Sequence, residues 1–187
     1  IGRSCTRLSD TLLTEDKEYM AELKLGESTD SFDRDGTVVN TSGKVPTEEE
    51  IRASLMKFQG DILQTPPMFS AKKVGGKKLY ELARKGIEIE RKACPVKVSI
   101  ELIDYSYPKL TLQVKCSKGT YIRSLAHDIG ISLGCYAHLT ELTRLKSGQF
   151  AINECIDGTL LYQEDLKPDL TKFLRQPYTE SESKVGF

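Results

Sequence analysis

The strongest constraint on the fold is a change of hydrophobic periodicity between residues 110 and 133. Leu110, Leu112 and Val114 alternate with polar residues, which predicts a β-strand with one buried face. After a polar loop, apolar residues recur at helical spacing from Thr120 to Leu133. The face that they form consists of Ile122, Leu125, Ala126, Ile129 and Leu133. The chain therefore contains a strand that leads into an amphipathic helix.

The rest of the chain mixes the same two patterns. Alternation predicts further strands at Tyr19–Leu25 and Val96–Ile100, and Thr47 with Glu50 resembles a capping box that opens a helix ending at Phe58. Ala137–Leu145 is ambiguous between helix and strand. Strands and helices in irregular order favour an α+β domain over a doubly wound parallel sheet.

Three further elements are expected from local signals. Leucines at helical spacing predict a short helix at Thr6–Leu13, and Phe69–Val74 is a candidate strand. Lys77–Lys85 is predicted as a helix, with Gly86 as its C-terminal cap. We expect a frayed C-terminus beyond residue 152 because the hydrophobic pattern weakens there.

Cysteine usage and apolar run lengths limit the class of protein. The five cysteines are odd in number and form no CxxC pair, so we expect a reducing compartment, buried thiols and no metal site. The apolar runs are only a few residues long, so we expect no membrane span.

Charge is balanced overall but unevenly distributed. The chain has 27 basic and 27 acidic residues. Residues 15–35 hold eight acids and three bases, a balance of −5, whereas residues 72–92 hold eight bases and three acids, a balance of +5. The second segment is a candidate docking surface for a polyanion, although a solvated charged helix would have the same composition.

Several motifs are better explained by structure than by chemistry. The Asp30–Gly36 segment lacks the ligand spacing of a calcium loop and is interpreted as a turn closed by aspartate side chains. Gly75–Lys78 lacks the phosphate-loop spacing. His127 and His138 belong to no metal or catalytic pattern, and we expect them to be structural or exposed.

Arg123 lies in the first turn of the helix that follows the loop Ser117–Thr120. A cation there opposes the helix dipole. This cost indicates that Arg123 has an anionic partner, either a carboxylate or a phosphate.

Together these segments resemble the TruB family of tRNA pseudouridine synthases. The matching segments occur in the family's order over about 135 residues. They are Asp16–Tyr19, Leu25–Gly26 with Thr29–Gly36, Pro66–Lys77 with Tyr80–Gly86, Gly119–Ser124, and Leu142–Arg144 with Ser147–Gly148. The resemblance implies a mixed, mainly antiparallel pseudouridine-synthase sheet with flanking helices, whose N-terminal part is missing here.

The resemblance also implies a reaction and its residues. A uridine of the tRNA T-loop, position 55 in standard tRNA numbering, would be isomerised to pseudouridine without a cofactor or a metal. The family's catalytic positions match Tyr19, Tyr121, Arg123 and Leu142. The tyrosine at the position of Tyr19 stacks on the flipped uracil in the family. The expected RNA-binding residues are Lys72, Lys73, Lys77, Lys78, Tyr80, Arg84, Lys85, Arg91 and Arg144. The partner would be the T-arm of tRNA, and we expect a cytoplasmic monomer.

Two departures from the family's pattern affect these expectations. The family's catalytic aspartate lies in a GTLDP-type motif upstream of the segment that matches Ile1–Arg3. We therefore expect the 187 residues alone to lack it, to leave Arg123 without that partner and to be inactive. Thr143 stands where the family usually has arginine.

The expected organisation is a partial catalytic core at residues 1–152 with a thumb-like RNA-binding insertion at 66–92, followed by a tail at 153–187. Two other functions stay open. One is a non-catalytic module that binds or folds tRNA, and the other is a relative of the guide-RNA-dependent pseudouridine synthases.

Overall fold

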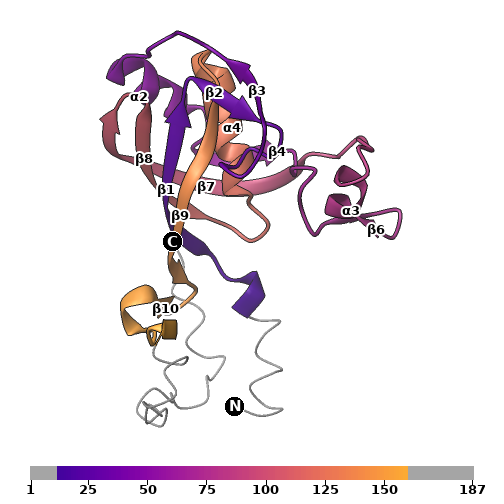
Figure 1. Ribbon diagram of the computed structural model, residues 1–187. Coiled ribbons are helices and arrows are strands. Elements are labelled where there is room, and N and C mark those ends of the chain that lie inside the picture. The colour runs from indigo at the N-terminus through magenta and orange to yellow at the C-terminus, as the bar shows by residue number, and fades with distance from the viewer. Residues whose placement is uncertain (1–11, 160–187) are drawn as a thin grey trace.

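The computed structural model describes residues 12–159, whose main feature is a six-stranded sheet (Figure 1). Its strands follow the order β10-β9-β1-β8-β7-β4, and every pair is antiparallel. Their bounds are β1 (Lys17–Leu25), β4 (Gly60–Gln64), β7 (Cys94–Ser106), β8 (Lys109–Cys116), β9 (Ala137–Ser147) and β10 (Phe150–Ala151). The predicted α+β class with a mainly antiparallel sheet is confirmed.

Strand β1 lies near the centre of the sheet and organises it. It pairs along its length with β8 on one side and β9 on the other. The ambiguous segment after residue 136 is therefore a strand, because pairing with β1 satisfies its backbone groups. The predicted strand–loop–helix unit is also present, with β8 leading into α4 (Ile122–Leu133).

Helices α2 (Glu48–Met56) and α4 pack on one face of the sheet. The predicted face of α4 is buried, and it meets alternate residues of β1, β8 and β7 in the core. The capping box of α2 is confirmed, since Thr47 accepts from the Glu50 N–H and Glu50 from the Thr47 N–H. Tyr19 points to the helix-covered face because it alternates with the buried Ala21 and Leu23.

A short hairpin of β2 (Glu27–Thr29) and β3 (Val38–Thr41) follows β1, and its turn is residues 30–37. Asp30 closes this turn by accepting a 2.9 Å hydrogen bond from the Thr37 N–H. This confirms the interpretation of the segment as an aspartate-closed turn. Residues 152–154 form a short 3-10 helix after β10.

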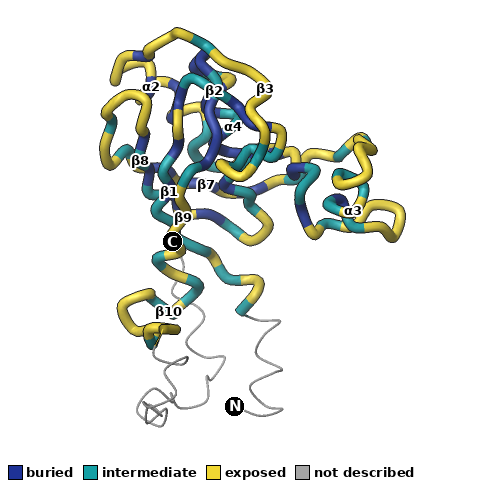
Figure 2. The backbone as a smooth tube through the Cα atoms, in the orientation of Figure 1, coloured by how far each residue is buried: buried dark blue, intermediate teal, exposed yellow. Residues whose placement is uncertain are grey.

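The basic insertion, residues 66–92, projects from the body of the domain and is largely exposed (Figures 1 and 2). It contains β5 (Lys73–Val74), β6 (Lys77–Lys78) and α3 (Leu79–Ala83). The helix predicted for Lys77–Lys85 is wrong at its start, because Gly75 and Gly76 adopt φ of 56° and 80° and form a two-residue hairpin. The candidate strand at Phe69–Val74 is likewise reduced to its last two residues.

The helix predicted at Thr6–Leu13 and the tail beyond residue 159 lie mostly outside the described residues. Within residues 12–159, none of the helices is both long and apolar enough to cross a bilayer. Cys116 and Cys135 are buried as predicted, whereas Cys155 is exposed.

Candidate functional site

The loop between β8 and α4 is held in a fixed shape by short contacts. Ser117 exchanges two hydrogen bonds with the backbone of Lys97, one through its N–H and one through its hydroxyl. The Thr120 hydroxyl donates to the Ser117 carbonyl at 2.9 Å. Gly119 has a φ of 84°, a conformation that favours glycine. These contacts fix the end of β8 and the loop, and thereby the positions of Tyr121 and Arg123 at the start of α4.

The first turn of α4 is also tied to residues 64–69, the segment that leads from β4 into the basic insertion. The buried Gln64 side chain bonds both backbone groups of Tyr121. The Ser124 hydroxyl donates to the Thr65 carbonyl at 3.0 Å. Arg123 Nη2 donates to the Phe69 carbonyl at 2.8 Å. These contacts join the base of the insertion to the helix that holds Arg123.

Arg123 faces a carboxylate from a different part of the chain. Its Nε lies 3.9 Å from Asp33 Oδ2, and the two side chains are 28% and 33% exposed. The predicted anionic partner is therefore present among the described residues and offsets the unfavourable helix dipole. Sequence reasoning did not place Asp33 in the site, although it lies in the matching segment Thr29–Gly36.

The turn that carries Asp33 is fixed from two sides. The backbone of Leu139 accepts from the Arg34 N–H and donates to the Phe32 carbonyl. Phe32 has a positive φ of 62°, and its ring stacks on His127 of α4 with centroids 3.9 Å apart. Burial lowers the pKa of His127, which favours the neutral ring. Helix α4 thus contacts the turn through both Arg123 and His127.

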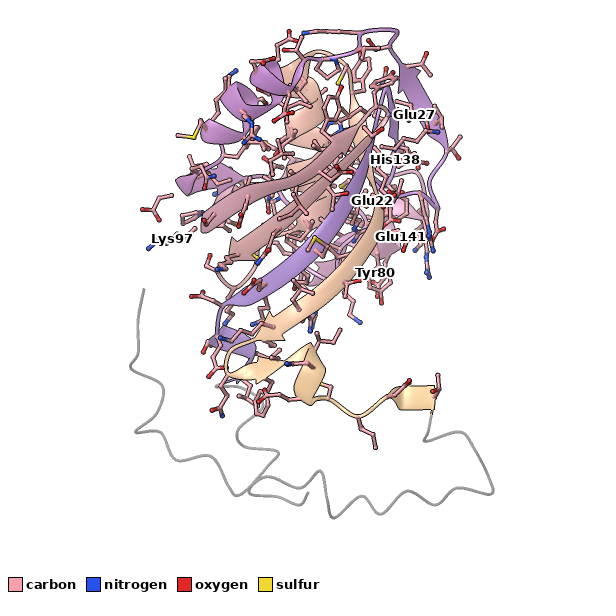
Figure 3. The ribbon with its side chains drawn as sticks, turned by 90° about the vertical axis from the view of Figure 1, so that its left-hand side faces the viewer. Glu22, Glu27, Tyr80, Lys97, His138 and Glu141 are labelled. Atoms are coloured by element: carbon pink, nitrogen blue, oxygen red, sulfur yellow. The ribbon has the colours of Figure 1, made fainter. Side chains whose placement is uncertain are left out.

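Both histidines contact other residues of the chain. His138 is buried on β9, with Nδ1 3.3 Å from the Glu27 carbonyl and Nε2 3.9 Å from the Glu27 carboxylate (Figure 3). The His127 ring packs against the Phe32 ring.

A cavity of about 570 Å³ opens beside Tyr19. Its walls come from residues 13, 14, 17 and 19 and from the end of β8 with its loop, residues 116–120. This volume falls within the range of small-molecule sites, about 300–1,000 Å³. Tyr19 is half-buried, and it is the one aromatic residue among the described residues that line this cavity.

Strand β9 places two of the predicted residues beside Tyr19. Tyr19 pairs with Arg144 in the ladder, and the Arg144 guanidinium lies over its ring at 5.5 Å. Leu142 pairs with Ala21, the next residue of β1 on the same face, and is 43% exposed. Tyr19, Leu142 and Arg144 thus form one surface, while Tyr121 and Arg123 begin α4 directly after the cavity-lining loop.

The basic insertion presents cations around one aromatic ring. Lys78 Nζ and the Arg84 guanidinium each lie 5.4 Å from the centre of the Tyr80 ring. In the exposed β5–β6 hairpin, Lys73 pairs with Lys78 and Val74 with Lys77, so the hairpin presents lysines on both of its faces. An exposed cationic surface with an aromatic ring suits a phosphate backbone with accessible bases.

Two predicted RNA-binding residues have internal partners at the base of the insertion. Arg91 donates to the Pro66 carbonyl at 3.2 Å and pairs with Glu88 at 3.0 Å. Lys72 Nζ lies 2.8 Å from Cys94 Sγ. These two cations therefore connect the first residues of the insertion with the residues at its end.

Comparison with known families gives two matches that together span most of the chain. The TruB family pseudouridylate synthase (N terminal domain) matches residues 1–122, and the tRNA pseudouridylate synthase B C-terminal domain matches residues 123–175. The boundary between them falls within the first turn of α4. Both matched segments therefore contribute strands to the same sheet.

Individual relatives named tRNA pseudouridine synthase B are also similar. The one from Chlamydia felis is 58% identical over 175 residues, which is 94% of this chain and 74% of the relative. The one from Protochlamydia amoebophila is 55% identical over 87% of this chain and 62% of the relative. The one from Clostridium kluyveri is 46% identical over 89% of this chain and 57% of the relative.

Solved structures share the fold. The Cbf5-Nop10-Gar1 complex matches with a TM-score of 0.62 and 31% identity over 84% of this chain. An H/ACA RNP bound to a substrate RNA containing 2'-deoxyuridine matches with a TM-score of 0.54 and 28% identity over 82% of this chain. This chain spans only 38% and 35% of those two proteins' chains.

Proposed function

The chain belongs to the TruB family of pseudouridylate synthases, and from that premise we propose that it forms part of a site that isomerises uridine 55 in the T-loop of tRNA. In this reaction the bond from C1′ to N1 breaks, the base turns, and a bond from C1′ to C5 forms. The C5 proton leaves to solvent and N1 gains a proton, so the atoms balance without a cofactor. The observation that carries the proposal is Tyr19, which lies on the wall of a cavity of about 570 Å³ beside the loop that leads to Arg123.

The proposed roles follow from where each side chain lies. The uracil must leave its stack, at a cost of a few kcal/mol, and the Tyr19 ring on the cavity wall would offer a replacement surface. Leu142 adds an apolar wall, and Arg144 keeps the Tyr19 ring in place while it presents a cation. Tyr121 and Arg123, at the start of α4, are assigned to the same site.

We assign T-arm binding to the basic insertion. The expected contacts are Lys72, Lys73, Lys77, Lys78, Tyr80, Arg84, Lys85 and Arg91, together with Arg144 near the cavity. Residues 72–92 carry a balance of +5 on a chain whose net charge is zero, and their cations would release counterions from the RNA on binding. The proposed division is a core at residues 1–152 with the insertion at 66–92, and a tail at 153–187. The protein would act as a cytoplasmic monomer.

The 187 residues contain no match to the aspartate motif of the family, so we propose that they bind T-arm RNA without isomerising it. Asp33 does not take over that role in this proposal, because it matches another position of the family and pairs with Arg123 from the β2–β3 turn. Guide-RNA-dependent modification is the second candidate, since the solved relatives include an H/ACA RNP. The relatives named tRNA pseudouridine synthase B, at 46–58% identity, favour the stand-alone function.

Tritium release from a T-arm stem–loop labelled at C5 of uridine 55 tests this proposal. The gene product that contains this chain should release tritium from that RNA with no guide RNA added. The same RNA with cytidine at position 55 is the matched control. Release that requires an added guide RNA would support the second candidate, and tight binding without release would support a tRNA-binding module.

A further inference from the structure

Gln64 makes a double hydrogen bond to the residue that starts α4. It is the last residue of β4 and is 2% exposed. Its Nε2 donates to the Tyr121 carbonyl at 3.1 Å, and its Oε1 accepts from the Tyr121 N–H at 2.7 Å. One buried amide thereby satisfies both backbone groups of a single residue, as a neighbouring strand would.

Tyr121 needs such a partner because of its place in the chain. It is the N-cap of α4, with an extended backbone at φ −105° and ψ 108°, and no side chain caps the helix there. Its N–H therefore has no partner within the helix. Its carbonyl accepts the first helical bond, from the Leu125 N–H at 3.1 Å, and also the Gln64 bond. Gln64 thus holds the residue at which the loop becomes a helix.

The position of Arg123 depends on where that helix starts. Arg123 lies two residues after Tyr121, and its guanidinium makes contacts with the Phe69 carbonyl and the Asp33 carboxylate. A shift of the first turn would move the Arg123 guanidinium relative to the Phe69 carbonyl and the Asp33 carboxylate. Displacements of about 1 Å far from the reacting atoms can cost about 100-fold in rate.

We propose that Gln64 is a positioning residue for the isomerisation, because it fixes the backbone of Tyr121 and, through it, the placement of Arg123. The inference rests on the proposed function for its catalytic consequence. Its structural part, that Gln64 orders the first turn of α4, stands on the two hydrogen bonds alone.

The chain offers a matched control at Gln59, the residue just before the same strand. Gln59 makes the same pair of hydrogen bonds to the backbone of Ile100 in β7. Its Nε2 donates to the Ile100 carbonyl at 2.6 Å, and its Oε1 accepts from the Ile100 N–H at 3.0 Å. Gln59→Met therefore removes two side-chain hydrogen bonds from the backbone of β7. Gln64→Met removes the equivalent two from the start of α4. A merely structural role predicts that the loss of activity in each variant follows its loss of folded protein.

Hydrogen exchange gives the first readout and needs no activity. In Gln64→Met, the amides of Tyr121 and Leu125 should exchange about 10-fold faster or more than in the wild-type chain, whereas Gln59→Met should leave them unchanged. Equal exchange at these amides in all three proteins would overturn the proposal, whatever the enzyme assay shows.

Steady-state kinetics of the gene product give the second readout. Gln64→Met should lower kcat about 10- to 100-fold with KM within about threefold, and Gln59→Met should change kcat by less than about threefold. Equal losses of kcat in both variants would overturn the positioning role. If the wild type releases no tritium, the proposed function fails, while the exchange measurement still decides what Gln64 does.

A conservative variant adds a pH signature and covers the case in which Gln64→Met does not fold. In Gln64→Glu the ionised side chain accepts from the Tyr121 N–H but cannot donate to its carbonyl, whereas the protonated form can do both. Protection of the Tyr121 amide, relative to wild type, should therefore rise as pH falls through the raised pKa of a buried carboxyl. A ratio that is independent of pH would contradict the proposal.

Discussion

Replacing Asp33 by asparagine isolates the charge that faces Arg123. Asparagine keeps the size of the side chain and its hydrogen-bonding oxygen but removes the negative charge. The fold of the turn should survive, because it is held by the backbone of Leu139 and by the Phe32–His127 stack rather than by the Asp33 carboxylate. Any large effect should therefore come through Arg123.

The expected size follows from the separation and exposure of the pair. At 3.9 Å, two unit charges interact by about 1 kcal/mol in water and about 4 kcal/mol at an effective dielectric constant of 20. The side chains are 28% and 33% exposed, so solvent screening reduces the contribution to about 1–2 kcal/mol. If the whole interaction between Asp33 and Arg123 stabilises the transition state, its loss lowers the rate of isomerisation about 5- to 30-fold.

Single-turnover conversion of T-arm RNA by the gene product measures the effect. The control is Glu141→Gln, which breaks the ion pair with Arg34, the residue after Asp33 in the same turn. That pair is 55% and 63% exposed, so its loss should cost at most about 0.5 kcal/mol and leave the rate unchanged. Equal rates for Asp33→Asn and wild type, or equal losses in both variants, would refute the reasoning.

Three further predictions concern stability and binding. Burial raises the pKa of Asp128 to about 6, so the native state must ionise a partly buried carboxyl and the free energy of unfolding falls as pH rises from about 4 to about 6. Asp128→Asn should then stabilise the chain by about 1–2 kcal/mol at pH 8 and by much less at pH 4 in urea unfolding; equal gains at both pH values would contradict this. Lys77→Ala should lower the slope of log K for T-arm RNA against log salt by about 1, while Lys115→Ala on the exposed side of β8 should not, and equal slopes would count against the insertion. Thr47→Ala should cost about 1–2 kcal/mol because it removes half of the capping box with Glu50, and an unchanged urea midpoint would exclude that contribution.

Elements with strong periodicity or explicit caps could be predicted from the sequence. The buried face of α4, the capping box of α2 and the alternation in β1 all depend on residues close together in the chain. The short edge strand β4 carries no such signal, because its only fully buried residue is Gln64. In the basic insertion, the helix propensity of the lysines was overridden by the two glycines with positive φ.

The candidate site likewise contains residues that could be predicted from the sequence and partners that could not. Tyr19, Tyr121, Arg123 and Leu142 stand in segments that match a family, so their identities could be proposed before the fold was known. The partners that hold them could not, because Asp33 and Gln64 reach Arg123 and Tyr121 across 90 and 57 positions of sequence. Only the pairing of β1 with its neighbours and the packing of α4 bring these groups together.

Position-resolved mapping of pseudouridine in cellular tRNA tests the central claim most directly. A bacterial host without its own TruB-family gene would receive this gene as wild type or as Arg123→Ala. The account predicts pseudouridine at position 55 with the wild type and its absence with Arg123→Ala at equal protein levels. Unmodified uridine 55 with the wild-type gene, or full modification with Arg123→Ala, would contradict it.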